Sequence, residues 1–467
     1  MRKLLWVFIV ILLSTGAGTV WADDSEILRE LEALKRKVQE LEAKLSEQEA
    51  RSDSVSAQKE SHTPPPVRGE ELEAIRKGEQ ETEGTPQPTA ANESEGTPLR
   101  GEELKSIQET IKEKLGTLRI HGGAVGYYQG RNGVDIEGMD FKDANGAGFA
   151  ADLELTFEPF KNGEFFMRAH AGEGDGADKD LSDNGALFAN LNTIADDNVG
   201  DEGVSLLEAF YTQQFFENRF FISIGKTEQV VFIDDNAFAN DEYTQFVGKP
   251  FVNNPVFDSE DEYAPLLALG VSPLKELTFT FLVQSSSRPR LEEDQQKSRY
   301  EDIFDTPFLA GQMTYSPEFC GLEGNYRVYG WGATYQHPNV AGEGTERGWG
   351  VGLSLDQRVH EKVGLFARLG YQNDEVYEVP WFWSVGSNLK GIIPCRGDDE
   401  IGLGVAGLKA NDDLKHDGTE YHLEAYYRIA LSEYFAITPD IQYVINPLGN
   451  DSNDDVVAGM VKGQFSF

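Results

Sequence analysis

Arginine and carboxylate side chains share one face of several alternating segments in this chain of 467 residues. Guanidinium groups donate hydrogen bonds and carboxylates accept them, so a mixed set suits a polyhydroxylated solute and carries no overwhelming charge. Aromatic rings at Tyr329, Trp331 and Tyr426 would add apolar contact for the C–H surface of such a solute. The predicted inward-facing set is Arg119, Asp152, Glu154, Arg168, Arg358, Arg368, Glu424, Arg428, Asp440 and Gln442. The competing interpretation is that these charges only pair with one another along a water-filled tube.

Alternation of apolar and polar residues with a period of two positions these side chains. Between residues 151 and 158, Ala, Leu, Leu and Phe alternate with Asp, Glu, Thr and Glu, and similar segments follow at 365–372, 421–429 and 435–443. Such a strand has one face toward lipid and one toward the interior of a barrel. From Leu118 onward there are about sixteen such segments, an even number as in bacterial single-chain barrels. The sequence therefore predicts an all-β transmembrane outer-membrane β-barrel of antiparallel strands over residues 118–467.

The connections between the predicted strands alternate in length. Short links fall at 159–163, 216–218, 272–276 and 431–434, and long ones at 130–146, 172–203, 227–263 and 286–305. Bacterial barrels have short periplasmic turns and long external loops, so both ends of this barrel are expected in the periplasm. Prolines make the segment 373–400 irregular, and a strand over 381–388 keeps the strand count even.

The long connection 227–263 is the best candidate for a loop folded into the barrel. Loops of this length without a core of their own are usually functional or disordered. This one is rich in polar and aromatic residues, and folding inward would narrow the channel. Its predicted pore-lining residues are Asp235, Asn236, Asn240 and Glu242.

The chain ends on an alternating stretch whose outward face carries Phe465 and Phe467. This pattern is typical of the closing strand of an outer-membrane barrel, so these two residues are predicted to close it against the first strand. Cys320 and Cys395 are compatible with one disulfide in an oxidising compartment.

The first 22 residues predict export. Arg2 and Lys3 precede an apolar run from Leu4 to Leu13, and small residues around Ala22 form a cleavage site. The apolar run is too short to cross a hydrocarbon core of about 30 Å comfortably, which favours a cleaved signal peptide over an anchor. With the barrel pattern, this predicts the bacterial outer membrane as the location.

Three further segments precede the barrel. Residues 23–49 carry apolar residues at heptad spacing, which predicts a coiled-coil helix for self-association or periplasmic contact. Residues 50–98 are too poor in apolar residues to bury a core, so a disordered linker is expected. Residues 99–117 predict a short helical segment that begins with a repeat of the linker motif at 67–72.

The net charge of −39 makes nucleic acid an implausible partner, because binding it requires basic surface. The mean hydropathy of −0.43 and the lack of a second long apolar run exclude a helical membrane protein. A barrel fits, because strands with one lipid-facing and one polar face average to a polar composition.

Several separated motifs resemble the carbohydrate-selective porin (OprB) family and occur in the family's order. They are the segments 221–226, 235–242, 244–246, 253–255, 324–327, 439–443 and 446–447. The resemblance covers about residues 118–467 and implies a largely monomeric barrel of sixteen strands that admits glucose and related sugars by facilitated diffusion. Arg327, inside one motif, joins the predicted pore-lining set. The family pattern implies no cofactor and no metal, and it does not include the coiled-coil segment.

Two alternative functions compete with sugar diffusion. The excess of acidic over basic residues favours a porin for cations or other small solutes, and the inward-facing arginines disfavour it. An outer-membrane enzyme is the third interpretation, but the chain has no G-x-S-x-G elbow, H-E-x-x-H motif or phosphate-binding loop. Adjacent acids such as Asp234 and Asp235 more often solvate a loop or bind a cation than hydrolyse glycosides.

Overall fold

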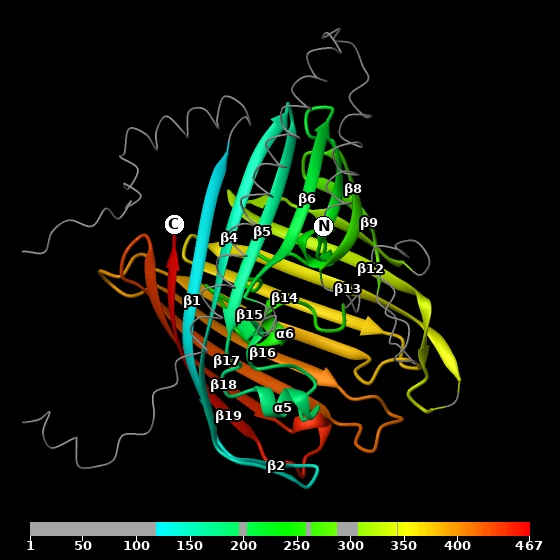
Figure 1. Cartoon of the computed structure of the whole chain (residues 1–467), viewed down its shortest axis with the longest axis vertical. Helices are drawn as coiled ribbons and strands as arrows, with labels where there is room; N and C mark the ends of the chain where they lie inside the picture. Colours follow the sequence, from blue (N-terminus) through cyan, green and yellow to red (C-terminus); the bar gives the residue numbers. More distant parts are fainter. Residues whose placement is uncertain (1–117, 196–202, 258–262, 287–306, 343) are drawn as a thin grey trace, which may run out of the picture. The chain divides into compact units, whose positions relative to one another are not determined.

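A computed structural model describes residues 118–195, 203–257, 263–286, 307–342 and 344–467 (Figure 1). The predicted signal peptide, coiled coil, linker and short helical segment, over residues 1–117, lie outside the described residues. No helix among the described residues is long and apolar enough to cross a bilayer.

Within the described residues, sixteen long antiparallel strands form one closed sheet, as predicted. Each strand pairs with the next along the chain, and a short extra pairing joins β11 (Glu318–Phe319) to the following strand. The long strands are β1 (Arg119–Arg131), β4 (Ala144–Phe160), β5 (Gly163–Glu173), β6 (Val204–Phe215), β7 (Phe220–Thr227), β8 (Ala264–Leu274), β9 (Leu277–Gln284), β10 (Phe308–Tyr315), β12 (Leu322–Pro338), β13 (Thr345–His360), β14 (Val363–Gln372), β15 (Trp381–Lys390), β16 (Glu400–Lys409), β17 (Thr419–Ala430), β18 (Phe435–Ile445) and β19 (Val456–Ser466).

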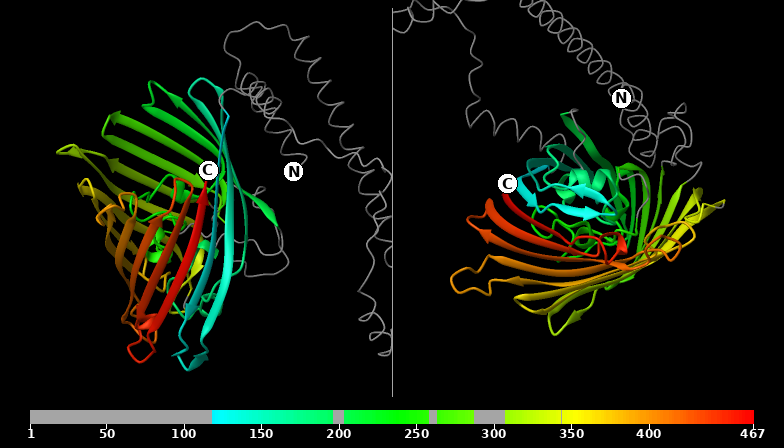
Figure 2. Two further views of the ribbon diagram at one scale, coloured as in Figure 1. Left: turned by 90° about the vertical axis from the view of Figure 1, so that its left-hand side faces the viewer. Right: turned by 90° about the horizontal axis from the view of Figure 1, so that it is seen from below.

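The first and last strands close the barrel. β1 pairs with β19 from Gly123 opposite Ser466 to Arg131 opposite Ala458 (Figure 2). At the end of this ladder, the amide of Phe467 donates to the carbonyl of Gly122 at 3.0 Å. The amide of Gly122 donates to the carbonyl of Phe467 at 3.1 Å. Phe465 and Phe467 are exposed, as lipid-facing rings should be. Pairing of the two terminal strands removes the free edges that an open sheet would present.

Strand facing follows the alternation in the sequence. Leu153, Leu365 and Ile441 are exposed on the outer face, whereas the neighbouring Arg368 and Asp440 are buried on the inner face. The connections also alternate as expected: two residues separate β4 from β5, while 36 residues, 228–263, separate β7 from β8. The irregular segment does contain a strand, β15, next to β14 and β16.

The possible disulfide is not formed, since Cys320 and Cys395 are both free and exposed. Cys320 lies before β12 and Cys395 lies after β15. Four strand spacings of about 4.8 Å separate their links by roughly 19 Å, whereas bridged cysteines need Cα atoms within about 7 Å. The two links are too far apart along the sheet for the bond.

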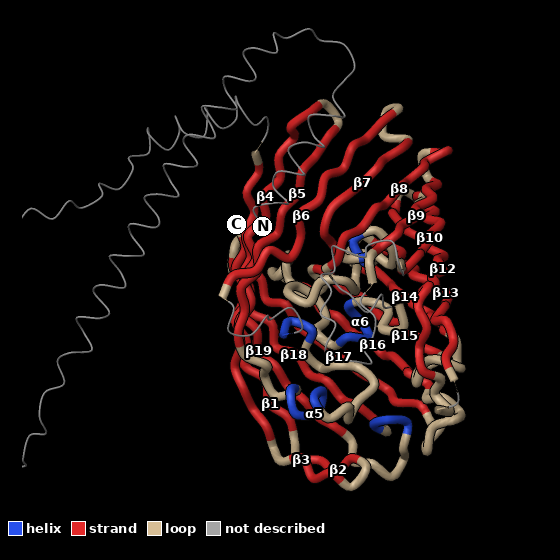
Figure 3. The backbone as a smooth tube through the Cα atoms, turned by 45° about the vertical axis from the view of Figure 1, so that its right-hand side comes forward, coloured by secondary structure: helices blue, strands red, loops and turns tan. Residues whose placement is uncertain are grey.

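Small elements fill the long connections, two of which enter the barrel (Figure 3). The connection between β1 and β4 forms the hairpin of β2 (Val134–Ile136) and β3 (Met139–Phe141). The β5–β6 connection contains α5 (Lys179–Asp183) and a 3₁₀ turn at Thr193–Ala195, and the β7–β8 connection contains a 3₁₀ turn at Gln229–Val231 and α6 (Lys249–Val252). A last 3₁₀ turn, Pro447–Gly449, precedes β19.

Candidate functional site: the lumen and its inserted loop

We call the β7–β8 connection, residues 228–263, the inserted loop because its described residues, 228–257 and 263, pack against the inner wall of the barrel. Its strongest link is a buried ion pair: Arg368 of β14 lies 3.1 Å from the carboxylate of Asp234, and both side chains are fully buried. The same guanidinium donates to the backbone carbonyls of Phe251 at 2.9 Å and of Asp234 at 3.1 Å. One arginine thus joins two distant parts of the inserted loop to the wall.

Two further wall residues form hydrogen bonds with the middle of the inserted loop. The carboxylate of Glu424, on β17, accepts from the amides of Val247 at 2.6 Å and Gly248 at 2.9 Å. The ammonium of Lys462, on β19, donates to the carbonyls of Glu242 at 2.6 Å and Gln245 at 2.7 Å. Charged groups therefore satisfy backbone atoms that the loop's irregular path leaves without partners.

An apolar cluster fills the space between the inserted loop and the wall from β8 to β17. The loop contributes Phe238, Phe246 and Phe251, among others, and the wall contributes Tyr329 and Phe382. The fit is close, since a Cβ atom at Gly364 of β14 would lie 2.3 Å from the Phe238 ring. Within this cluster, the loop and the wall are packed like a protein core and leave no room for a solute.

The described start of the β5–β6 connection, residues 174–195, also enters the barrel. Its Leu191 is buried, and the Leu191 carbonyl accepts from the amide of Gln442, on β18, at 2.8 Å. Its Ile194 packs with Val125 of β1 and Val247 of the inserted loop. The lumen is thus also filled beside β1, β4 and β19.

Open space remains on the side of the inserted loop that faces β5 and β6. A cavity of about 180 Å³ lies there, lined by Arg168 of β5, Glu208 of β6 and Glu228 at the start of the loop. Arg168 lies 2.9 Å from Glu208 and 3.2 Å from Glu228, and it donates to the Tyr263 hydroxyl at 2.6 Å. Two carboxylates and Tyr263 hold the arginine, yet 18 % of its side-chain surface remains exposed.

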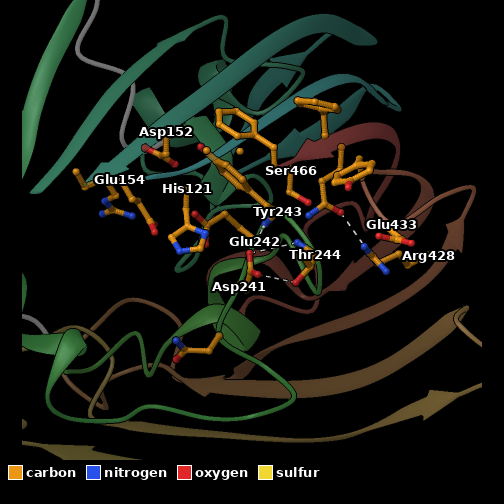
Figure 4. A pocket seen from close by; sticks show the side chains of 18 residues that line it. His121, Asp152, Glu154, Asp241, Glu242, Tyr243, Thr244, Arg428, Glu433 and Ser466 are labelled. Carbon is orange, nitrogen blue, oxygen red and sulfur yellow. Dashed lines mark hydrogen bonds between the residues drawn. The ribbon is translucent and has the colours of Figure 1, made fainter. Parts of the chain in front are cut away.

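A larger cavity of about 720 Å³ continues toward the barrel end that carries the short links. Its labelled side chains come from β1 and β4, from the inserted loop, from the end of β17 with its following turn, and from the end of β19 (Figure 4). Three residues line both cavities: Arg168 on the wall, and Asn240 and Glu242 on the inserted loop. We call these three the junction residues. They bring an arginine, an amide and a carboxylate to one narrow place.

The predicted pore-lining residues separate into groups. Asp152 and Glu154 line the larger cavity, and Arg428 lines both it and a third cavity, of about 410 Å³, that Arg358 also lines. Arg119 lies at the start of β1, paired with Glu158 at 3.2 Å and Glu164 at 2.6 Å.

Most of the remaining predicted pore-lining residues hold the inserted loop or the β5–β6 connection against the wall. Asp235 pairs with Arg327 at 3.3 Å but keeps 64 % of its side-chain exposure. The structure corrects the pore-lining role expected of the others, because they are buried and their bonds go to the loops or to neighbouring wall residues. They are Asn236, Arg327, Arg368, Glu424, Asp440 and Gln442. The aromatic candidates Tyr329, Trp331 and Tyr426 are likewise covered, by the apolar cluster.

Sequence reasoning missed Glu208, Glu228 and Tyr263 around Arg168. At Glu208 a β-bulge shifts the register between β5 and β6, since Arg168 opposes Glu208 while Ala169 opposes Leu206. A bulge adds one residue and breaks the period of two, so alternation alone assigns the wrong face beyond it. The entry of residues 174–195 into the barrel was also missed, although the apolar Leu181, Leu191 and Ile194 were a signal for it.

Comparison with known proteins identifies the family. The model of the carbohydrate-selective porin, OprB family, matches residues 137–467. The chain belongs to this family. Membership of the OprB family and the barrel fold imply an outer-membrane location and favour a channel over an enzyme.

Individual OprB relatives are distant. Porin B of Pseudomonas aeruginosa is 26 % identical over 151 residues, which are 27 % of this chain and 33 % of Porin B. An uncharacterized Aquifex aeolicus protein is 30 % identical over 223 residues, 47 % of this chain and 58 % of that protein. The chain therefore spans about a third to just over half of these relatives.

The fold is shared more widely than the sequence. The high-pH structure of Pseudomonas putida OprB matches with a TM-score of 0.65 and 18 % identity. The match covers 78 % of this chain and 97 % of the Pseudomonas putida chain. At this identity the match demonstrates the fold, and the roles of particular side chains follow from the geometry above.

Proposed function

We propose that this protein is an outer-membrane porin through which sugars of about glucose size diffuse along the β5–β6 side of the inserted loop. The observation that carries the proposal is the junction of the two cavities, where Arg168 faces the loop residues Asn240 and Glu242. These groups offer donors and acceptors to hydroxyl groups of either orientation. The resemblance to carbohydrate-selective porins supports the same solute class.

Liposome swelling tests the sugar assignment. The refolded full-length protein is reconstituted, and swelling is compared between glucose and an uncharged solute of equal size. Faster glucose entry is expected, because only a solute with several hydroxyl groups can replace its water with the polar groups at the junction. Equal rates for the two solutes would contradict sugar preference while leaving an open channel in place.

Cation permeation is the second candidate. Glu208, Glu228 and Glu242 line the smaller cavity against Arg168 and Lys249, so carboxylates outnumber cationic groups on this part of the route. Acidic pore linings favour cations. A reversal potential in a potassium chloride gradient measures this preference directly, and a potential of zero would remove it.

We infer further that residues 1–22 are a cleaved signal peptide and that residues 23–49 mediate self-association or periplasmic contact. The charged start, apolar run and heptad pattern support these roles. Deletion of residues 23–117 should leave the barrel folded and reduce the number of protomers per particle in detergent. An unchanged number of protomers would exclude self-association through this segment.

A further inference from the structure

A recess under the inserted loop has a charge opposite to that of the chain as a whole. The cavity of about 410 Å³ is lined by Arg358 of β13, Lys390 of β15 and Arg428 of β17, against the single carboxylate of Glu400. It shares Arg428 and Thr244 with the larger cavity, so the two adjoin. The chain carries a net charge of −39, which makes a cationic recess unusual within it.

Two of the cationic groups in this recess are not neutralised. Lys390 lies 2.8 Å from Glu400, so those two charges offset each other. Arg358 lies over the ring of Phe238, with its Cζ atom 5.4 Å from the ring centroid. Arg428 donates to the amide oxygen of Gln464 at 3.2 Å. Neither Arg358 nor Arg428 forms an ion pair with a carboxylate in the part of the chain that the structure describes.

The contrast with the other lumen arginines is chemical. Arg168, Arg327 and Arg368 each have a carboxylate partner within 3.3 Å. A guanidinium has five donors in a planar fork that matches a carboxylate or phosphate, and Arg358 and Arg428 keep most of these donors available. The stacking of Arg358 on Phe238 holds its plane in place without occupying its donors.

We propose that this recess binds the carboxylate or phosphate group of an anionic solute the size of a monosaccharide. β13 and β17 are four strand spacings apart, about 19 Å along the sheet, and Arg358 and Arg428 line the same cavity. The volume is within the range of small-molecule sites. Acidic groups on the β5–β6 route repel the same solute, so the lumen separates neutral from anionic sugars.

Calorimetric titration of the refolded full-length protein in detergent tests the proposal, with sodium gluconate and inorganic phosphate as probes and glucose as the neutral comparison. Saturable binding of gluconate, phosphate or both is expected, and the probe that binds identifies the anionic group. Arg358→Gln and Arg428→Gln should each weaken that binding about tenfold, because each removes a charge-assisted contact. Arg428→Lys should weaken it less, since the charge stays and the fork is lost.

Arg347→Gln is the matched control, because Arg347 is exposed at the start of β13, on the outer face beside Trp349. Barrel folding of every variant is checked by its heat-dependent mobility in gels, and the lysine variant keeps the test open if a glutamine variant fails to fold. No saturable binding of either anion, or an equal loss in Arg347→Gln, would overturn the proposal. The titration needs no vesicle, so its failure is distinguishable from a failure of sugar transport.

Discussion

The two sides of the inserted loop use the same residue types for different purposes. On the packed side, Arg368 and Asp234 form a fully buried pair beneath an apolar cluster. On the open side, Arg168 also pairs with carboxylates, but it keeps 18 % of its side-chain exposure beside two cavities. Both arginines were predicted to face inward, and both do. What separates a structural charge from a solute-facing one is whether the loop covers it.

The largest effect is expected on the packed side. Arg368→Met leaves the Asp234 carboxylate buried without a cationic partner, which costs about 3–5 kcal/mol and should release the inserted loop from the wall. Release should raise single-channel conductance and admit oligosaccharides larger than glucose in liposome swelling. Asp234→Leu combined with Arg368→Met removes both charges and should restore much of the original size limit. An unchanged size limit in the single variant would mean that the pair does not hold the loop.

A smaller effect on the same side is expected from Glu424→Gln. The variant places an NH2 group where one of the two oxygens accepts from the Val247 or Gly248 amide, so one buried donor loses its acceptor, a loss of about 1–3 kcal/mol. We expect brief conductance increases in single-channel records as the loop detaches and returns. A steady current identical to that of the parent protein would argue that Lys462 alone suffices to hold this part of the loop.

On the open side, Arg168→Gln should change solute preference and leave the size limit unchanged. Loss of one charge-assisted contact weakens interaction with a hydroxylated solute about tenfold. The variant also leaves Glu208, Glu228 and Glu242 less compensated, so the reversal potential should move toward greater cation preference. Liposome swelling and reversal potentials on one preparation measure both effects. A widened size limit instead would assign Arg168 to holding the loop.

The smallest effect is expected away from the inserted loop, at Asp399 in the β15–β16 link. Burial would raise the pKa of Asp399, but hydrogen bonds from Arg396, from the Tyr427 hydroxyl and from the Ala430 amide lower its pKa below the ordinary value of 3.8. Its stabilising contribution is therefore complete above that value and is lost as the pH falls through the lower folded pKa.

Asp399→Asn should remove this contribution at neutral pH, at a cost of about 1 kcal/mol or less. Thermal unfolding followed by circular dichroism measures it, with the parent and variant converging in strong acid. The size limit of the pore should not change, and a change would link this rim to the inserted loop.

The strand pattern was predictable because lipid on one side and polar groups on the other impose a strict period of two. β15 was found through the required even count despite Pro380 and Pro394. Which inward side chains a loop covers was not predictable. Alternation shows which face of the sheet a side chain lies on, but it carries no information about a loop that folds over that face. Arg368 and Glu424 were therefore assigned correctly to the inner face but not to their structural role, and the bulge at Glu208 concealed a neighbour of Arg168.

Blocking the junction with a thiol reagent tests most directly whether solutes pass on the β5–β6 side of the inserted loop. Glu242→Cys is made in a protein in which Cys320 and Cys395 are serine, because both native thiols are free and exposed. Val351→Cys, exposed on the outer face of β13, is the matched control. A bulky thiol reagent should abolish most single-channel conductance of Glu242→Cys and leave that of Val351→Cys unchanged. Full conductance after complete modification at residue 242 would contradict the proposed route.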